Sequence, residues 1–125
     1  MSEIVIKRIY EPFEEQDGYR VLIDRLWPRG ISKEQAQLNE WAKEIAPSPS
    51  LRKWFGHKPE RFIEFKNQYL IELYEDHVKV NKMKEIIQKS NFQKVTLLYG
   101  AKNSKYNHAV VLLNELLLQQ STNHE

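Results

Sequence analysis

The loop that follows an apolar segment near the N-terminus holds several side chains that bind charge or move protons. The segment Tyr19–Asp24 runs into the sequence IDRLWPRG, which brings Asp24, Arg25 and Arg29 close to one another. Charged groups are costly at the end of a buried strand unless an opposite charge meets them. Guanidinium groups bind phosphates and carboxylates through paired hydrogen bonds. Arg25 and Arg29 therefore predict an anion site, in which Asp24 holds one arginine or acts as a general base and Trp27 forms a wall.

A second loop of similar character follows the apolar segment Val95–Tyr99. Its sequence GAKNSKYNHA offers the amine of Lys102, the amide of Asn107 and the imidazole of His108. An imidazole can transfer protons near neutral pH, so His108 is a candidate acid or base. The Tyr99 hydroxyl can orient a substrate, and a helix that begins after His108 would add free N–H groups for an anion.

A third cluster, LRKWFGHKPER, alternates basic and aromatic side chains. Arg52, Trp54 and His57 could stack on nucleobases and neutralise phosphates, and His57 is a second candidate for proton transfer. Each of these clusters also has a structural interpretation. The tryptophans can be core anchors, Tyr99 can be a partly buried residue at a strand end, and the charged groups can pin loops or lie on the solvent face.

Composition excludes several classes of protein. The chain has 125 residues, no cysteine, and a net charge of only +2, so disulfides, thiolate chemistry and a strongly basic duplex binder are not expected. The glycine-rich motifs of dinucleotide and P-loop sites are absent, and the four histidines lack the spacing of metal ligands, so we expect no cofactor and no metal. The N-terminus does not resemble a signal peptide and no apolar run is long enough to span a membrane, which favours a cytoplasmic protein.

Strands and helices must bring these loops together. Alternating and apolar patterns predict strands at Ile4–Ile9, Tyr19–Asp24 and Val95–Tyr99, and a short strand in EWAKEIAP, where a helix is the alternative. The first two strands could form a hairpin, or they could be parallel with a longer crossover. If Tyr19–Asp24 and Val95–Tyr99 are parallel neighbours, the two charged loops share one edge of the sheet.

Helices are predicted between these strands. Ser32 should cap a short helix in KEQAQL, and Ser50 a second one that ends at Gly56. A third should follow Pro59, a fourth should span roughly residues 80–89, and a fifth should contain NHAVVLLNELLLQ. The apolar stripe of the third helix contains Phe62, Phe65, Tyr69 and Leu73. Together the pattern predicts one α/β domain over residues 1–120, with a small, mostly parallel sheet flanked by helices and a disordered tail at residues 121–125.

Several blocks of the sequence resemble the YeaO-like family of small bacterial proteins of unknown function. They are KRIYEP, GYRVLIDRLWPRGISKE, EWAKEIAPSPSLRKWFGHKPERF and VTLLYGAKNSKYNHAVVL, which cover nearly the whole chain. The resemblance implies a single compact domain of Rossmann-like character, and it lends no settled activity. The motif positions that it carries over are Asp24, Arg25, Trp27, Pro28, Arg29, Arg52, Trp54, His57, Asn107 and His108.

The leading hypothesis is a domain that binds a small anionic or phosphorylated ligand. Arg25, Arg29 and Lys102 would hold the anion, aromatic residues would line the site, and, if the protein is an enzyme acting on a nucleotide-like molecule, Asp24 or His108 would move a proton. The alternative is a non-catalytic protein that binds single-stranded nucleic acid. A third option is a homodimer formed through the apolar C-terminal helix. The sequence does not choose between enzyme and binding protein, and it does not fix the oligomeric state.

Overall fold

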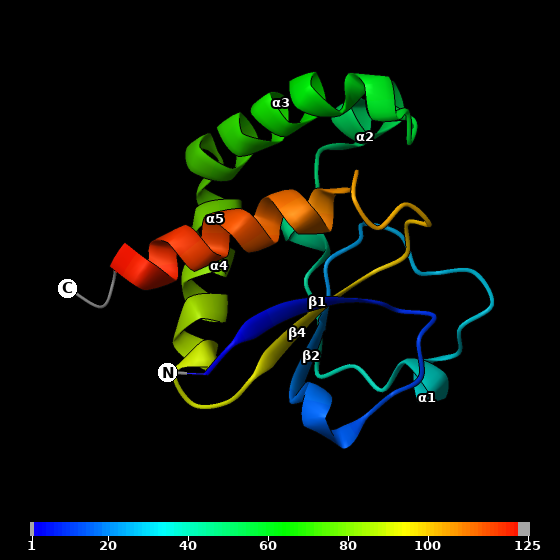
Figure 1. Ribbon diagram of the computed structural model, residues 1–125, viewed down its shortest axis with the longest axis vertical. Coiled ribbons are helices and arrows are strands. Elements are labelled where there is room, and N and C mark those ends of the chain that lie inside the picture. Colours follow the sequence, from blue (N-terminus) through cyan, green and yellow to red (C-terminus); the bar gives the residue numbers. More distant parts are fainter. Residues whose placement is uncertain (1, 123–125) are drawn as a thin grey trace.

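The computed structural model describes residues 2–122 and contains a four-stranded parallel sheet (Figure 1). The strands are β1 (Ile4–Arg8), β2 (Tyr19–Leu22), β3 (Glu40–Trp41) and β4 (Val95–Tyr99), in the spatial order β1-β4-β2-β3. All five residues of β4 are buried, as its nearly continuous apolar sequence predicts for a strand covered on both faces. The α/β class and the small parallel sheet are therefore confirmed.

The position of β4 decides between the two arrangements considered for the first strands. Because β4 lies between β1 and β2 and is parallel to both, the first two strands do not form a hairpin. The short strand expected in EWAKEIAP is present as β3, but it has only two residues and gives way to a 3-10 helix at Lys43–Ile45. The expected parallel pairing of β2 with β4 is confirmed, and it places the loops after both strands at one edge of the sheet.

Residues 2–122 also form five α-helices and two further 3-10 helices, of which the last α-helix follows β4 and the others lie between strands. The α-helices are α1 (Lys33–Ala36), α2 (Pro49–Phe55), α3 (Phe62–Glu75), α4 (His77–Ser90) and α5 (His108–Thr122). The 3-10 helices span Glu15–Asp17 and Pro59–Arg61. No helix in this part of the chain is long and apolar enough to cross a membrane.

Capping residues explain where the shorter helices begin and end. Ser32 caps α1 as predicted, in a reciprocal arrangement with Gln35. The cap of α2 is Ser48 and not Ser50, because Pro49 occupies the first helical position and the Ser48 hydroxyl accepts a hydrogen bond from Leu51 N. Gly56 ends α2 in the left-handed conformation, as predicted.

The longer helices extend beyond their predicted limits. Asp76 caps α4 by accepting a hydrogen bond from Val78 N, so the helix begins at His77 and not near Val80. Helix α5 continues to Thr122, and thus two residues of the expected tail are helical. The remainder of that tail, residues 123–125, lies outside the described residues.

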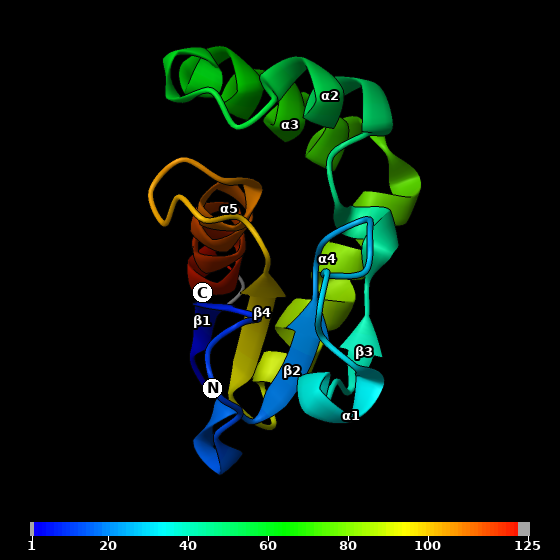
Figure 2. The ribbon, with the colours of Figure 1, turned by 90° about the vertical axis from the view of Figure 1, so that its right-hand side faces the viewer.

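Helices α4 and α5 cover one face of the sheet and α1 lies against the other, while α3 packs on α4 and α5 beyond the carboxyl ends of the strands (Figure 2). The larger core joins Val21 of β2 and Leu97 of β4 to the buried stripe of α3, which contains Phe65, Tyr69 and Leu73 as predicted. A smaller cluster on the opposite face contains Ile9, Leu22, Ala36 and Leu98. The buried face of α3 is therefore part of the larger core and closes it at the carboxyl ends of the strands (Figure 2).

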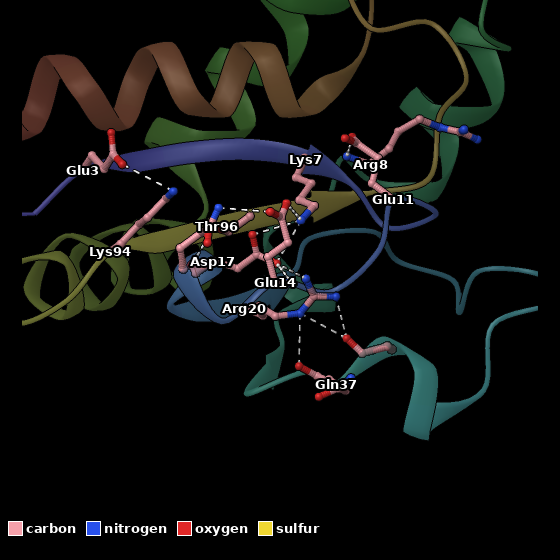
Figure 3. Close-up of polar contacts among 12 residues, drawn as sticks. Glu3, Lys7, Arg8, Glu11, Glu14, Asp17, Arg20, Gln37, Lys94 and Thr96 are labelled. Atoms are coloured by element: carbon pink, nitrogen blue, oxygen red, sulfur yellow. Dashed lines mark hydrogen bonds and ion pairs between the residues drawn. The ribbon is translucent and has the colours of Figure 1, made fainter.

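Polar side chains fix the connection between β1 and β2 to the sheet (Figure 3). Asp17 is buried and forms ion pairs with Lys7 at 3.0 Å and with Arg20 at 2.6 Å. Arg20 is only 1% exposed, and it also donates to the carbonyl oxygens of Ala36 and Gln37. Burial by itself would raise the pKa of Asp17, but hydrogen bonds from Glu14 N, Lys7 and Arg20 lower it below the usual carboxyl value. This network anchors the connection between β1 and β2, together with α1. It does not include the loops at the carboxyl ends of β2 and β4.

Candidate functional site

A pocket of about 590 Å³ lies where the loops after β2 and β4 face α2 and α3. Figure 2 shows both strands pointing toward these helices. We call this space the rim pocket. The predicted site residues that line it are Asp24, Arg25, Trp27, Arg52, His57, Lys102, Asn107 and His108. Three clusters that are distant in the sequence therefore meet at the carboxyl edge of the parallel sheet.

Three of the predicted site residues lie outside the lining of the rim pocket. Arg29 is exposed beyond Pro28. Trp54 is 41% exposed on α2, where the guanidinium of Arg61 lies over its ring. Tyr99 is only 4% exposed, and burial raises the pKa of its phenol. These three residues are therefore not part of the rim pocket.

The carboxylate of Asp24 connects the ends of the two central strands. Its Oδ2 accepts a hydrogen bond from Gly100 N at 2.9 Å, and its Oδ1 lies 3.1 Å from His108 Nε2. Oδ1 is buried and, within residues 2–122, receives no well-directed hydrogen bond. We expected from the sequence that Asp24 would hold an arginine, and in the structure it does not. It joins the two charged loops to each other.

The guanidinium of Arg25 is held by backbone carbonyl groups. Nε donates to Pro47 O, and Nη2 donates to both Ala46 O and Pro47 O, at 3.2–3.3 Å. Nη1 has no hydrogen-bond partner in the described residues and is open to solvent. Arg25 is thus fixed in place by neutral acceptors, and no acidic side chain of residues 2–122 forms an ion pair with it.

Three further basic side chains line the rim pocket from other segments. Arg52 belongs to α2, His57 follows that helix with a left-handed backbone, and Lys102 belongs to the loop after β4. All three are exposed, and none forms an ion pair within residues 2–122. The only acidic side chain in the lining is Asp24. The electrostatic potential in the rim pocket should consequently be positive.

The N-terminus of α5 adds to this positive character. Asn107 caps the helix, because its Oδ1 accepts a hydrogen bond from Val110 N while its Nδ2 donates to Asn103 O. Helix N-termini carry partial positive charge and attract anions. Asn107 and His108 both line the rim pocket, so this end of α5 faces its interior.

Apolar side chains form the rest of the lining. Phe55 of α2 and Phe65 of α3 stack with their ring centroids 4.2 Å apart. Trp27 contacts the pocket and also the core, since its Nε1 donates to Ile31 O and its ring packs edge-on against Trp41 at 5.3 Å. The functional and structural interpretations of Trp27 are thus compatible.

Sequence reasoning missed several lining residues. Tyr10 follows β1 at the same edge of the sheet, and the rule that placed the other two loops there would have found it. Phe55 and Phe65 were interpreted as core residues, which the structure confirms, and both also line the pocket. The carbonyl groups that hold Arg25 come from Ala46 and Pro47, which have no side-chain signal for such a role.

The arrangement suits the binding of an organic anion. Cationic groups and helix N–H groups bind phosphates and carboxylates, and the apolar surface accommodates an attached body. Within residues 2–122, no three histidine, aspartate or glutamate side chains are arranged to hold a metal ion.

Comparison with known proteins supports the resemblance found in the sequence. Residues 3–125 match the protein family described as the inactive DUF488-N3 subclade. The uncharacterized protein YeaO of Escherichia coli is 48% identical over 113 residues, which cover 90% of this chain and 96% of that protein. An uncharacterized protein of Mycobacterium tuberculosis is 37% identical over 111 residues, 89% of this chain and 91% of its own length. No solved structure matches the chain, and its Rossmann-like character stays a prediction.

Proposed function

The chain belongs to the YeaO-like family described as the inactive DUF488-N3 subclade, and from this premise we propose that it binds a small organic anion in the rim pocket without transforming it. Phosphate monoesters and carboxylates attached to a ring or another apolar body are the ligand class. Arg25, Arg52 and Lys102 contact the anionic group, and the side chains of Phe55 and Phe65 contact the body.

The observation that carries the proposal is a set of positive charges without acidic partners. Arg25, Arg52 and Lys102 come from three different segments, and all line one pocket in which Asp24 is the only acid. Solvated basic side chains on a protein surface are common, but they usually project away from one another. Here they surround a concave space that also includes the N-terminus of a fifteen-residue helix.

Size and polarity support an organic ligand more than an inorganic ion. The rim pocket has a volume of about 590 Å³, within the range of small-molecule sites. An inorganic phosphate would fill only part of this volume, and burial of exposed apolar surface in the lining, such as that of Leu26, favours an organic body. A nucleoside monophosphate or another ring-bearing phosphate has both parts that the lining complements.

The description of the subclade as inactive supports binding over catalysis. Asp24 and His108, the two candidates for proton transfer, contact each other and the backbone in ways that also hold the two loops together. Incubation with 4-nitrophenyl phosphate tests the catalytic alternative. We expect no release of nitrophenolate above the rate without protein, and release that depends on His108 would contradict the non-catalytic proposal.

Thermal shift and calorimetry with matched probes test the proposed function. Phenyl phosphate, adenosine monophosphate and benzoate carry both an anion and a ring, whereas benzyl alcohol and sodium phosphate each carry one part. We expect saturable binding and a raised melting temperature for the first group. Equal or absent effects for all probes would contradict the proposal.

Nucleic-acid binding is a second candidate because one exposed aromatic residue lies beside basic groups. Trp54 is under the guanidinium of Arg61, which also donates a hydrogen bond to Trp54 O. Arg52 and His57, however, line the rim pocket and do not extend this pair into a longer stripe. A single-stranded oligonucleotide should therefore bind no more tightly than a mononucleotide. Tighter binding that falls steeply with salt would favour the nucleic-acid alternative.

A further inference from the structure

The two ring nitrogens of His108 have contrasting surroundings. Nε2 lies 3.0 Å from the carbonyl oxygen of Ile23 and 3.1 Å from Asp24 Oδ1. Nδ1 has no hydrogen-bond partner in the described residues, and it is accessible to solvent. Because His108 lines the rim pocket, Nδ1 is open to a molecule that enters it.

The contact with Ile23 determines which nitrogen carries the hydrogen. A carbonyl oxygen can only accept, so Nε2 carries a hydrogen in both the neutral and the charged imidazole. In the neutral ring, Nδ1 then has a lone pair and no hydrogen. A lone pair that faces an anion is repelled by it, whereas a protonated Nδ1 donates a charge-assisted hydrogen bond.

The charges that surround His108 oppose one another in the free protein. Asp24, in the loop after β2, faces the ring with a buried Oδ1 that receives no hydrogen bond within residues 2–122. Arg25 and Lys102 line the same pocket, and the N-terminus of α5 adds partial positive charge. Tyr69 of α3, with its ring centroid 6.2 Å away, stays neutral because burial raises the pKa of its phenol well above the usual value. The other ionisable basic groups of the lining are Arg52 and His57.

We infer that the rim pocket binds its anion together with one proton, which His108 takes up at Nδ1. This inference rests on the proposed function, since it describes how the anion site works. The bound anion supplies the negative charge that favours the imidazolium over the opposing cations. His108 then contacts the anion directly, while Asp24 keeps the ring in position from the opposite side.

The affinity for an anion should therefore depend on pH. An imidazole changes charge between about pH 5 and 8, whereas arginine, lysine and aspartate side chains ordinarily keep their charge across about pH 6 to 8.5. Once the imidazole is neutral in the free protein, each unit of increasing pH should weaken binding by up to about tenfold. Binding should take up about one proton per ligand in the same range.

Calorimetric titration with phenyl sulfate tests this inference. The sulfate ester stays a monoanion over this pH range, so any pH dependence comes from the protein. Titrations in two buffers of different ionisation enthalpy count the protons taken up. We expect binding to weaken with increasing pH in the unmodified protein. In His108→Gln, whose amide can still donate to Ile23 O, we expect weak binding without this slope.

His57→Gln is the matched control, because it removes the other histidine of the lining. This variant should keep the slope, and loss of the slope in His57→Gln alone would overturn the inference. Measurable but pH-independent binding to the unmodified protein would overturn the inference and leave the proposed function intact. Absence of binding of both phenyl sulfate and phenyl phosphate at every pH would overturn both.

A second variant keeps the test decisive if His108→Gln does not fold, as judged by circular dichroism. Asp24→Asn removes the carboxylate that favours the imidazolium. The pH profile of phenyl sulfate binding should then shift to lower pH. An unchanged profile in folded Asp24→Asn would overturn the role assigned to this pair.

Discussion

Replacement of Arg52 by glutamine separates a binding role from a structural one. The Arg52 side chain is exposed and forms no hydrogen bond or ion pair with another described residue, yet it lines the rim pocket. A hydrogen bond to a charged partner contributes about 1.5–3 kcal/mol. Because solvent screens an exposed arginine, we take the lower end, about 1.5 kcal/mol, which corresponds to about tenfold weaker binding.

Calorimetric titration with phenyl phosphate at constant pH and ionic strength measures this effect. The free energy of unfolding from chemical denaturation should change by less than about 0.5 kcal/mol, as is usual for an exposed site without partners. Arg29→Gln is the matched control, since it removes the same charge from an exposed residue outside the lining. Equal weakening by Arg29→Gln and Arg52→Gln would show an effect of net charge alone and would contradict a direct contact between Arg52 and the anion.

Three further predictions concern the framework of the site. Asp17→Ala should lower the free energy of unfolding by about 3–5 kcal/mol, because it leaves the buried guanidinium of Arg20 without its carboxylate, and denaturant titration measures the loss. Because the pKa of Asp17 is lowered in the folded protein, its contribution to the free energy of unfolding is fully present above pH 3.8 and is lost as the pH falls through the folded-state pKa. An equal difference in stability between this variant and the unmodified protein at every pH would contradict that role. Ser48→Ala should cost about 1–2 kcal/mol in the same assay, because Ser48 caps α2 and donates to Glu72 at 2.6 Å, and an unchanged midpoint would count against that cap. Gly18→Ala should prevent stable folding, measured by circular dichroism, because its φ is +69° and the new Cβ would lie 2.3 Å from Lys94 O; a native spectrum would contradict this.

The arrangement of the site at one edge of the sheet could be predicted from the sequence. Two apolar segments were each followed by a polar loop, and parallel strands place such loops at the same edge. Strands β2 and β4 need only be parallel neighbours for this to hold, and the structure confirms that they are. Arg25, Lys102 and His108 accordingly line one pocket.

The directions of individual side chains in those loops could not be predicted in the same way. Arg25 and Arg29 are four residues apart, but Arg25 is fixed by carbonyl groups of a segment about twenty residues away, and Arg29 lies in solvent beyond Pro28. Loop residues lack the periodicity that assigns faces to strands and helices. The partner of Asp24 was unpredictable for the same reason, because Gly100 N becomes available only where β4 ends beside β2.

An amide NMR titration of the protein with phenyl phosphate tests most directly whether the rim pocket binds an anion. We expect saturable shifts for Arg25, Gly100, Lys102 and His108, together with the amides of α2. Their common binding curve should weaken about tenfold in Arg52→Gln and not in Arg29→Gln. Shifts that do not saturate, or that are confined to the surface around Trp54 and Arg61, would contradict the assignment of the rim pocket as an anion site.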